Sequence, residues 1–457
     1  MLFRSERFGH FLYSALSNAF IELDEFHYRC VEELRRSSEF SKPDAEDEFL
    51  FLLRQKKILV EEGEEEQALM ERHYRRNGLS FDNAHLVLSI CPTLRCNFRC
   101  SYCFQDSQQS TTVMSADTVE RLISFIRNFK HARSLSITWY GGEPTMAFGV
   151  IGLITRRIKE LDILFEDAGL VTNGYLLGDD KIKQLNDLNI KTVQITLDGP
   201  EEVHDSRRVL VTGGPTHQRI MKNVDALMSS DYQGGCRIRI NVDRRNLSGF
   251  FELRARLLDR FEGKNLCVYA GCIDTAGGRK PDRKCNFCAQ EWVDFTIRQY
   301  REIGVAHRGE IYPAGSVLNI CSANSRNGFV VGPDGELYKC WEDVGKADMV
   351  IGTIYKDDFI TNRELVVRYS VGSDPYLDAK CRECKVLPIC GGGCANKRLR
   401  AKYFHEEGLE FCSLYKDSIV TYLMEYYDVF LAKEMCRRVL AGGAVTRDER
   451  GYRLVHP

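Results

Sequence analysis

The sequence lacks a long apolar run, and it lacks a clear excess of charge of either sign. No apolar stretch approaches the length of about 18 residues that a transmembrane helix needs. The 63 Lys and Arg against 65 Asp and Glu give a formal net charge of −2, so no global field attracts nucleic acid or an anionic membrane. The first residues, Met-Leu-Phe-Arg-Ser-Glu-Arg, carry charges where a signal peptide has an apolar core. We expect a cytoplasmic protein that binds neither membrane nor nucleic acid.

Cysteine is the residue present in excess, with 18 in 457 residues. In a long chain without an export signal, these thiols are not expected to form a disulfide framework. They cluster, with three at 96–103 and seven between 321 and 412. Clustered thiols in a reducing compartment are typical ligands of metals and iron–sulfur clusters. Most of the others are expected to be buried small apolar residues, but Cys285 and Cys288 remain candidate ligands.

The first cluster is the stretch Cys96-Asn-Phe-Arg-Cys100-Ser-Tyr-Cys103, which follows a predicted strand at 85–90. Three thiolates on one tight loop can each hold one iron of a cubane [4Fe–4S] cluster, which leaves the fourth iron open. A structural zinc knuckle is the alternative, but no fourth Cys or His lies near enough to complete it.

This C-x3-C-x2-C spacing, with Phe98 and Tyr102 inside it, resembles the radical S-adenosylmethionine (radical SAM) superfamily. The resemblance implies that Cys96, Cys100 and Cys103 are the catalytic cluster ligands and that Tyr102 lies at the cofactor. It also implies that the open iron takes the amino and carboxylate groups of S-adenosylmethionine (SAM). An electron from the cluster then breaks a carbon–sulfur bond and releases a 5′-deoxyadenosyl radical.

Strands and helices alternate from residue 85 to about 275, and six β-α units in a row predict a parallel sheet with outer helices. The resemblance implies a partial (β/α)6 barrel with its active site at the C-terminal ends of the strands. The predicted strands are 86–90, 135–139, 169–172, 192–197, 237–242 and 266–270, and the clearest helices are 115–130 and 247–261.

Several of these strands end in residues suited to cofactor binding. The second is followed by Gly141-Gly142-Glu143-Pro144, where paired glycines let backbone approach a ligand closely. This stretch resembles the family's GGEP motif, which implies contact with the methionine amino group; a plain Gly-Gly turn is the alternative.

Two later strand ends add further candidates. Asn173 lies in a TNG turn, and Thr196 and Asp198 lie in a stretch similar to the family's S-x-D-G-P, with Thr in place of Ser. The H-D-x-x-R spacing that follows implies that Arg208, in preference to Arg207, binds the methionine carboxylate, a role suited to a bidentate guanidinium.

The second cysteine array begins with Cys321 and Cys340, which flank a predicted hairpin with a Pro-Asp-Gly turn. The order and spacing of the array resemble the SPASM extension of radical SAM enzymes. The resemblance implies two auxiliary [4Fe–4S] clusters, one on Cys381, Cys384, Cys390 and Cys412 and one on Cys321, Cys340 and Cys394. With the primary cluster, this makes three. Two zinc sites are the alternative.

The array departs from the family pattern at two positions. Some members carry a further cysteine about six residues before the first SPASM cysteine, where this chain has Gly315. An auxiliary iron could then stay open to a substrate thiolate or be capped by Cys285 or Cys288. Relatives that make formylglycine carry an Asp directly after the second SPASM cysteine, and this Asp acts as a base. This chain has Trp341 at that position, and Glu342 or Asp343 could serve as the base instead.

Residues 1–84 are expected to form a small separate unit. Its predicted elements are a hairpin over 10–14 and 19–24, helices from Asp24, over 49–53 and over 64–76, and a short strand at 58–60. This winged-helix-like pattern usually binds DNA, but an acidic run at 61–66 argues against a phosphate partner. The unit resembles the leader-peptide recognition element of radical SAM peptide maturases, which implies that its exposed sheet edge receives a precursor peptide as an added strand. A purely structural extension is the alternative.

The sequence therefore predicts an α/β radical SAM/SPASM enzyme that matures a ribosomally synthesised peptide. The expected domains are the recognition module at 1–84, the barrel at 85–275, a bridging region at 276–320, the SPASM domain at 321–415, and a C-terminal helix and tail at 416–457. The missing cluster ligand and the N-terminal module favour a thioether crosslink from Cys sulfur to carbon, with an electron donor such as flavodoxin or ferredoxin. The alternatives are a carbon–carbon or cyclophane crosslink, sulfatase formylglycine formation, and a non-catalytic zinc-binding transcription regulator.

Overall fold

The computed structural model describes residues 1–36, 48–103, 105, 111–273, 286–304, 311–315, 317, 318, 320–440 and 451–456, with side chains of the last helix as far as residue 433. Cys285 and the side chain of Cys436 lie outside this description. Among the described residues, no helix combines the length and the apolarity that crossing a bilayer requires.

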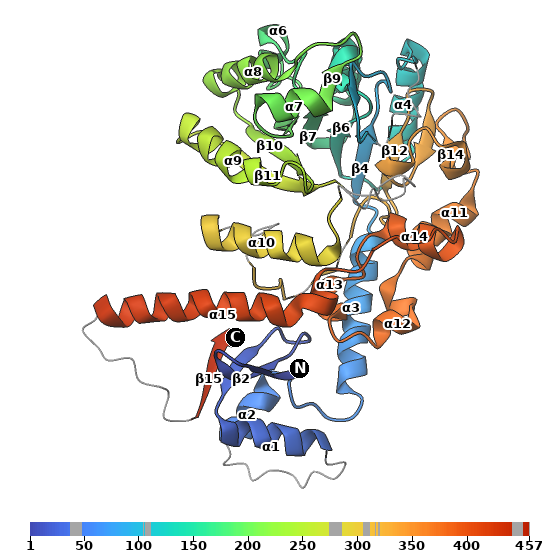
Figure 1. The fold of residues 1–457 in the computed structure, drawn as a ribbon. Coiled ribbons are helices and arrows are strands. Elements are labelled where there is room, and N and C mark those ends of the chain that lie inside the picture. Colours follow the sequence, from blue (N-terminus) through green and yellow to red (C-terminus); the bar gives the residue numbers. More distant parts are fainter. Residues whose placement is uncertain are drawn as a thin grey trace.

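The N-terminal part of the chain is a four-stranded antiparallel sheet with helices, at the bottom of Figure 1. The predicted hairpin is confirmed, because His10 to Tyr13 pair with Leu23 to Phe20. The strands, in sheet order, are β1 (Leu2–Ser5), β2 (Gly9–Tyr13), β3 (Phe20–Leu23) and β15 (Tyr452–His456). The helices are α1 (Glu25–Arg36), α2 (Glu48–Gln55) and α3 (Glu64–Ser80).

Two expectations for this part were wrong. The stretch Ile58–Val60 is not a strand, because the N–H groups of Ile58 and Leu59 donate to the Leu53 carbonyl and close the end of α2. The fourth strand comes instead from the C-terminal end of the chain, which was predicted to be a tail. The N- and C-terminal segments consequently share one sheet, and Figure 1 shows the two termini side by side.

Six parallel strands form the central sheet, as predicted. Their order is β11-β10-β8-β7-β6-β4, so each strand pairs with its neighbour in the chain and the row curves without closing. The strands are β4 (His85–Ile90), β6 (Ser134–Trp139), β7 (Leu164–Thr172), β8 (Ile190–Leu197), β10 (Gly235–Val242) and β11 (Leu266–Cys272).

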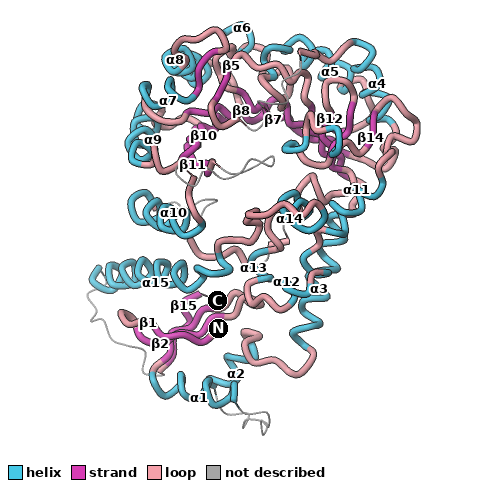
Figure 2. The backbone as a smooth tube through the Cα atoms, turned by 45° about the vertical axis from the view of Figure 1, so that its right-hand side comes forward, coloured by secondary structure: helices cyan, strands magenta, loops and turns pink. Residues whose placement is uncertain are grey.

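Helices cover the outer, convex side of this row (Figure 2). They bury apolar faces against it: α4, for example, is capped by the Ser115 hydroxyl and buries Leu122, Ile123 and Ile126. The helices of this part are α4 (Ala116–Arg127), α5 (Phe148–Ile158), α6 (Asp179–Ile182), α7 (Glu201–Arg207), α8 (His217–Ser229) and α9 (Ser248–Arg260). The α/β fold with a parallel core is thereby confirmed.

The C-terminal cysteine region extends the same sheet. Strand β12 (Gly328–Val331) pairs in parallel with β4, and the predicted hairpin to β13 (Glu336–Tyr338) is confirmed. The other elements are β14 (Gly352–Thr353), α10 (Ala289–Ile303), α11 (Arg363–Val367), α12 (Ala379–Arg382), α13 (Leu387–Cys390), α14 (Ala395–Tyr403) and α15 (Tyr415–Leu440).

Candidate active site

A cavity of about 1330 Å³ lies at the C-terminal ends of the parallel strands and continues along β10 and β11. The predicted residues that line it are Cys96, Cys100, Tyr102, Cys103, Gly141, Gly142, Asn173, Thr196 and Arg208. Among the described lining residues, Glu143, Pro144 and Asp198 do not occur. Most of the predicted cofactor residues therefore line one cavity, and these three lie outside its described lining.

The cysteine loop is held by a short pairing with a distant part of the chain. Strand β5 (Phe98–Cys100) pairs with β9 (Arg208–Leu210), and Cys100 and Arg208 are direct partners in this ladder. The carbonyl of Arg207 also accepts from the N–H of Ser101 at 3.2 Å. The loop and the H-D-x-x-R motif thus form one wall.

All three cysteines of the loop line the cavity. The described residues contain no group of three or more His, Cys, Asp or Glu side chains arranged to hold a single metal ion. Burial raises the pKa of the Cys96 thiol to about 12, with a further contribution from Glu143, so this thiol stays protonated unless a metal binds it.

The two glycines after β6 pass directly over the cysteine loop. A Cβ atom on Gly141 would lie 2.4 Å from the Thr93 carbonyl oxygen, and φ is +121° there. A Cβ on Gly142 would lie 2.4 Å from the carbonyl oxygens of Leu94 and Arg95. The close approach of these two segments requires glycine at both positions, and it leaves backbone exposed to the cavity.

Glu143 braces the strand ends. It is fully buried and accepts hydrogen bonds from Thr145 N and Oγ1, from Thr172 Oγ1 and from Asn173 N, at 2.5 to 3.0 Å. These donors occupy both oxygens of the Glu143 carboxylate. Glu143 thereby positions the turn after β7 and the start of the short helix at Pro144. Asn173 is positioned in turn, since its amide donates to Asn97 Oδ1 at 2.8 Å.

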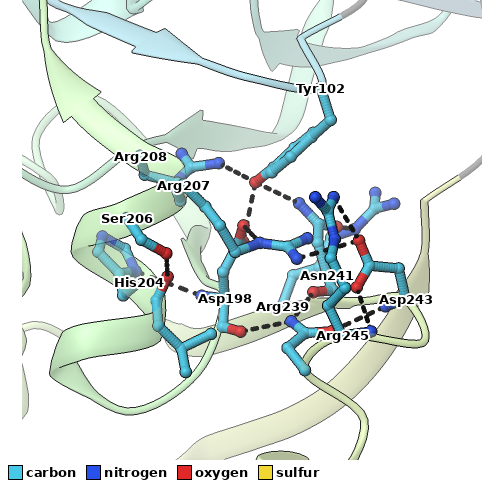
Figure 3. Close-up of polar contacts among 12 residues, drawn as sticks. Tyr102, Asp198, His204, Ser206, Arg207, Arg208, Arg239, Asn241, Asp243 and Arg245 are labelled. Atoms are coloured by element: carbon cyan, nitrogen blue, oxygen red, sulfur yellow. Dashed lines mark hydrogen bonds and ion pairs between the residues drawn. The ribbon is translucent and has the colours of Figure 1, made fainter. Parts of the chain in front are cut away.

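Tyr102 is the centre of a polar network beside the cluster loop (Figure 3). Its hydroxyl donates to Asp198 at 2.8 Å and accepts from Arg208 Nη1 at 2.7 Å and from Asn241 Nδ2 at 3.1 Å. Nε of Arg208 is buried and has no hydrogen-bond partner among the described residues. A buried guanidinium that borders the cavity and keeps a donor unused fits the carboxylate of SAM.

The neighbouring Arg207 has a different role. It donates to Asp198 and to Asp243, at 3.0 Å each, and all three side chains are buried. Both of its carboxylate partners come from the chain itself, so Arg207 ties the ends of β8 and β10 together. Arg208 lines the cavity, whereas Arg207 does not occur among the described lining residues.

His204 fixes the turn that carries Arg208. Its Nδ1 accepts from the Asp198 N–H at 3.2 Å, so Nε2 carries the proton and donates to Thr216 Oγ1 at 3.1 Å. The Thr216 hydroxyl then donates to the Arg208 carbonyl at 2.7 Å. Burial lowers the pKa of His204 to about 2, with nearby arginines adding to the shift, so the imidazole is neutral.

Sequence reasoning missed the polar face of β10. Arg239 and Asn241 line the cavity, and Arg239 Nε donates to Asn241 Oδ1 at 2.8 Å. Arg239 crosses β11 at Gly271, where a Cβ would lie 2.3 Å from its Nε. The signal was present as the alternation of Arg237, Arg239 and Asn241 with buried Ile238 and Ile240.

The residues directly after Cys340 also line the cavity. Trp341 stacks on Tyr140 with ring centroids 5.3 Å apart, and both rings line the cavity with Glu342. Asp343 instead is fully buried and accepts from the Tyr369 hydroxyl, from Asn396 at 2.9 Å and from Arg400 at 3.1 Å. Of the two acids considered for the missing base, the structure places Glu342 at the cavity.

Six of the seven later cysteines lie in two neighbourhoods, and the segment before the seventh, Cys412, lies beside Cys394. Burial, acidic neighbours and the adjacent Cys394 raise the pKa of Cys340. Cys321 interacts electrostatically with the buried amine of Lys339, so it lies near Lys339 and the next residue, Cys340. The N–H of Cys394 donates to the Phe411 carbonyl at 3.3 Å, which brings the segment before Cys412 alongside.

The other neighbourhood contains Cys381, Cys384 and Cys390. Arg398 donates to Cys381 Sγ at 3.1 Å, and Cys390 contributes to raising the Cys381 pKa after burial. Cys384 and Cys390 pack against one apolar cluster. Cys288 is held at the start of α10 through Glu291 and does not occur among the described cavity-lining residues.

Residues 90–244 match the family model described as the Radical SAM superfamily. The chain is 22% identical over 380 residues to a serine-type anaerobic sulfatase-maturating enzyme of Bacteroides thetaiotaomicron, which covers 74% of this chain and 89% of that protein. Over 118 residues it is 36% identical to a GTP 3′,8-cyclase of Clostridium perfringens, which covers 25% of this chain and 35% of that protein.

Two solved structures share the fold. Native anSMEcpe with bound AdoMet superposes with a TM-score of 0.56 at 19% identity and covers 77% of this chain and 100% of its own. Streptococcus suis SuiB bound to the precursor peptide SuiA gives a TM-score of 0.50 at 19% identity and covers 92% of this chain and 98% of its own.

Proposed function

We propose that this chain, an enzyme with a radical SAM domain, forms a thioether crosslink between a Cys sulfur and a carbon in a ribosomally synthesised precursor peptide. One observation carries the proposal. The cavity is lined both by Cys96, Cys100 and Cys103 of the first cysteine loop and by Trp341 and Glu342, directly after Cys340. A substrate side chain in this space would lie between the radical source and an auxiliary cluster.

The cofactors implied are SAM and three [4Fe–4S] clusters. We assign the primary cluster to the first cysteine loop, one auxiliary cluster to Cys321, Cys340 and Cys394, and the other to Cys381, Cys384, Cys390 and Cys412. When bound, the primary cluster and SAM supply the 5′-deoxyadenosyl radical, and the auxiliary clusters supply an acceptor for the electron left after bond formation. Flavodoxin or ferredoxin would serve as the electron donor.

The chain's own residues bind SAM, orient the substrate and take up a proton. Arg208 binds the SAM carboxylate and is oriented by Tyr102, while the backbone at Gly142 receives the amino group. Trp341 and Tyr140 form an aromatic wall against the substrate. Glu342 is positioned to take the proton of a substrate thiol. Each crosslink then removes two hydrogens from the peptide, one as a hydrogen atom and one as a proton, together with one electron.

The N-terminal sheet and helices are proposed to recognise the leader of the peptide. The support is that SuiB, which this chain resembles over 92% of its length, is described as bound to a precursor peptide. The described cysteines form no disulfide, which suits work in the reducing cytoplasm.

Formylglycine formation in a sulfatase is the second candidate function. The similarity to a sulfatase-maturating enzyme favours it, and Glu342 could replace the Asp that such relatives carry. A carbon–carbon or cyclophane crosslink would use the same cavity with a different acceptor residue.

Anaerobic reconstitution and mass spectrometry test the proposal. The reduced enzyme is incubated with SAM and the precursor peptide encoded beside its gene, and the thioether predicts the loss of two hydrogens per linkage together with blocked cysteines. An unchanged peptide, or a modified peptide whose cysteines all stay alkylatable, would contradict it. A parallel incubation with a sulfatase-motif peptide tests formylglycine formation. Iron analysis should give about twelve irons per chain, as three cubane clusters contain.

A further inference from the structure

The edge of the N-terminal hairpin sheet is covered by the chain's own last strand. The resemblance to a leader-peptide recognition element implied an exposed edge of the hairpin sheet, but β15 pairs antiparallel with β3 at this edge. Arg453 lies opposite Glu22, and Leu454 lies opposite Ile21. The register shifts between Leu454 and His456, so regular pairing is short.

The side chains of β15 fill separate sites along this edge. Tyr452 is buried against Phe49, with ring centroids 5.0 Å apart, and Val455 is buried against a second apolar cluster. His456 stacks on Tyr312 with centroids 4.0 Å apart. The edge therefore offers apolar sites at three positions of an extended segment.

Charge and backbone shape select the other positions. Arg453 Nη2 donates to Glu22 at 2.5 Å and to the Tyr427 hydroxyl at 2.9 Å. Gly451 accepts from the Asp24 N–H at 2.7 Å with φ of +75°, and a Cβ there would lie 2.3 Å from the Asp24 carboxylate. Leu454 packs against the apolar cluster under the sheet. Together these sites favour the pattern glycine, aromatic, basic, aliphatic, aliphatic, aromatic.

The N-terminal module has a core of its own without this strand. The cluster under the sheet consists of Leu12, Ile21, Leu23, Tyr28, Val31, Phe49 and Leu53, and the C-terminal strand adds the buried Tyr452 and the partly buried Leu454. An added strand contributes main-chain hydrogen bonds and side-chain pockets, both of which another extended peptide can supply. The strand can therefore be exchanged without dismantling the module.

The direction of β15 matters as well. Figure 1 shows its C-terminal end toward α13 and α15, which lie between this sheet and the body that holds the cavity. A peptide bound along β3 in the same direction would send its later residues toward that body. This is the order of a leader followed by a modified core.

We propose that the β3 edge binds an extended peptide of this pattern and that β15 is its intramolecular occupant, displaced when the peptide binds. The inference rests on the proposed function for the identity of the peptide as a leader, but the exchange itself is independent of catalysis. In the full chain, only a minor fraction of molecules has β15 displaced from the β3 edge. The apparent affinity for a peptide is lowered in proportion to this fraction.

Peptide binding to a shortened chain tests the exchange. The probe is fluorescein-labelled Gly-Tyr-Arg-Leu-Val-His-Pro, the sequence of residues 451–457, and the readout is fluorescence anisotropy. The chain ending at residue 450 should bind the probe at least about ten-fold more tightly than the full chain, as a minor open state of 10% or less requires. A folded shortened chain that ignores the probe would overturn the proposal.

A charge exchange across the strands tests the register. Shortened Glu22→Arg should lose the probe and instead bind a peptide with glutamate in place of its arginine. In the full chain, Arg453→Glu should loosen β15 and raise probe affinity, whereas Glu22→Arg with Arg453→Glu should restore the closed edge. If the shortened chain does not fold and full-length Arg453→Glu binds the probe no better than the unaltered chain, β15 is a fixed part of the sheet and the proposal is wrong.

SAM cleavage separates the two proposals. Release of 5′-deoxyadenosine without substrate should be equal in the full and shortened chains, since β15 does not occur among the described cavity-lining residues. Probe binding without any peptide crosslinking would contradict only the proposed function. Crosslinking with a β15 that never exchanges would contradict only this inference.

Discussion

Arg208 and Cys100 are direct partners in the β5–β9 ladder, although they lie far apart in the sequence. The pairing places the cationic side chain of Arg208, whose Nε has no partner among the described residues, beside the Cys100 thiol at the cavity. The next residue, Arg207, points to two buried carboxylates instead.

The two arginines should therefore respond differently to substitution. Arg208→Lys keeps the charge but loses the fork of donors, so KM for SAM should rise about ten- to a hundred-fold while the free energy of unfolding changes little. Arg207→Met leaves Asp198 buried without its cation and leaves Asp243 with only the exposed Arg245 at 3.1 Å, so it should lower the free energy of unfolding by about 3–5 kcal/mol. Isothermal titration with SAM and urea unfolding separate the two effects. Equal SAM affinity for Arg208→Lys and the parent would refute the ligand assignment.

The cysteine assignments predict a split between cofactor cleavage and product. Cys100→Ala should abolish release of 5′-deoxyadenosine, because the primary cluster loses one of three ligands. Cys340→Ala should retain cleavage and lose the crosslink. Chromatography of the nucleoside and mass spectrometry of the peptide measure the two outcomes. The assignments fail if both variants keep both activities.

Glu342 and Asp343 are adjacent but face different surroundings. Glu342→Gln should lower crosslink formation at least about ten-fold with cofactor cleavage maintained, since a positioned base contributes a factor of roughly 10² to 10⁴. Asp343→Asn should instead lower the free energy of unfolding by about 3 kcal/mol, because it removes the charge that Arg400 and Tyr369 share in the interior. A Glu342→Gln enzyme with unchanged product rate and pH profile would rule out the base.

Gly142→Ala tests the close contact between the strand end and the cysteine loop. The added methyl would meet two carbonyl oxygens at 2.4 Å, so one segment must move at a cost of about 1–3 kcal/mol. We expect weaker SAM binding and altered cluster absorption after reconstitution. Gly149→Ala, where a Cβ meets nothing within 4 Å, is the matched control and should behave like the parent.

His204 predicts acid sensitivity of the fold. Its pKa in the folded chain, about 2, lies below the ordinary value of 6.5, so the unfolded chain binds the extra proton. Stability from the neutral imidazole is complete above about pH 6.5 and is lost as pH falls, by up to about 1.4 kcal/mol per pH unit. His204→Asn, which keeps an acceptor and a donor but does not titrate, should flatten this dependence between pH 6.5 and 4.5 in urea unfolding. Parallel curves for the two proteins would refute the buried neutral histidine.

The sequence by itself determined the local elements of this enzyme. The six parallel strands, the Pro-Asp-Gly hairpin and the loops after β4, β6 and β7 each follow from short patterns of apolar period, glycine and cysteine spacing. Such patterns act within a few residues, so they are legible without the fold. The alternation of arginine and isoleucine in β10 was equally legible, but its meaning depends on which face of the strand meets the cavity.

Only the tertiary structure decided the relationships between distant segments. It paired Cys100 with Arg208, turned Glu342 rather than Asp343 toward the cavity, and set β15 on the edge of β3. A strand edge presents the same N–H and C=O groups to any extended segment, so the sequence of β3 does not name its partner. The partner is decided by which chain end reaches that edge and by side chains, such as Arg453 opposite Glu22, that fit along it.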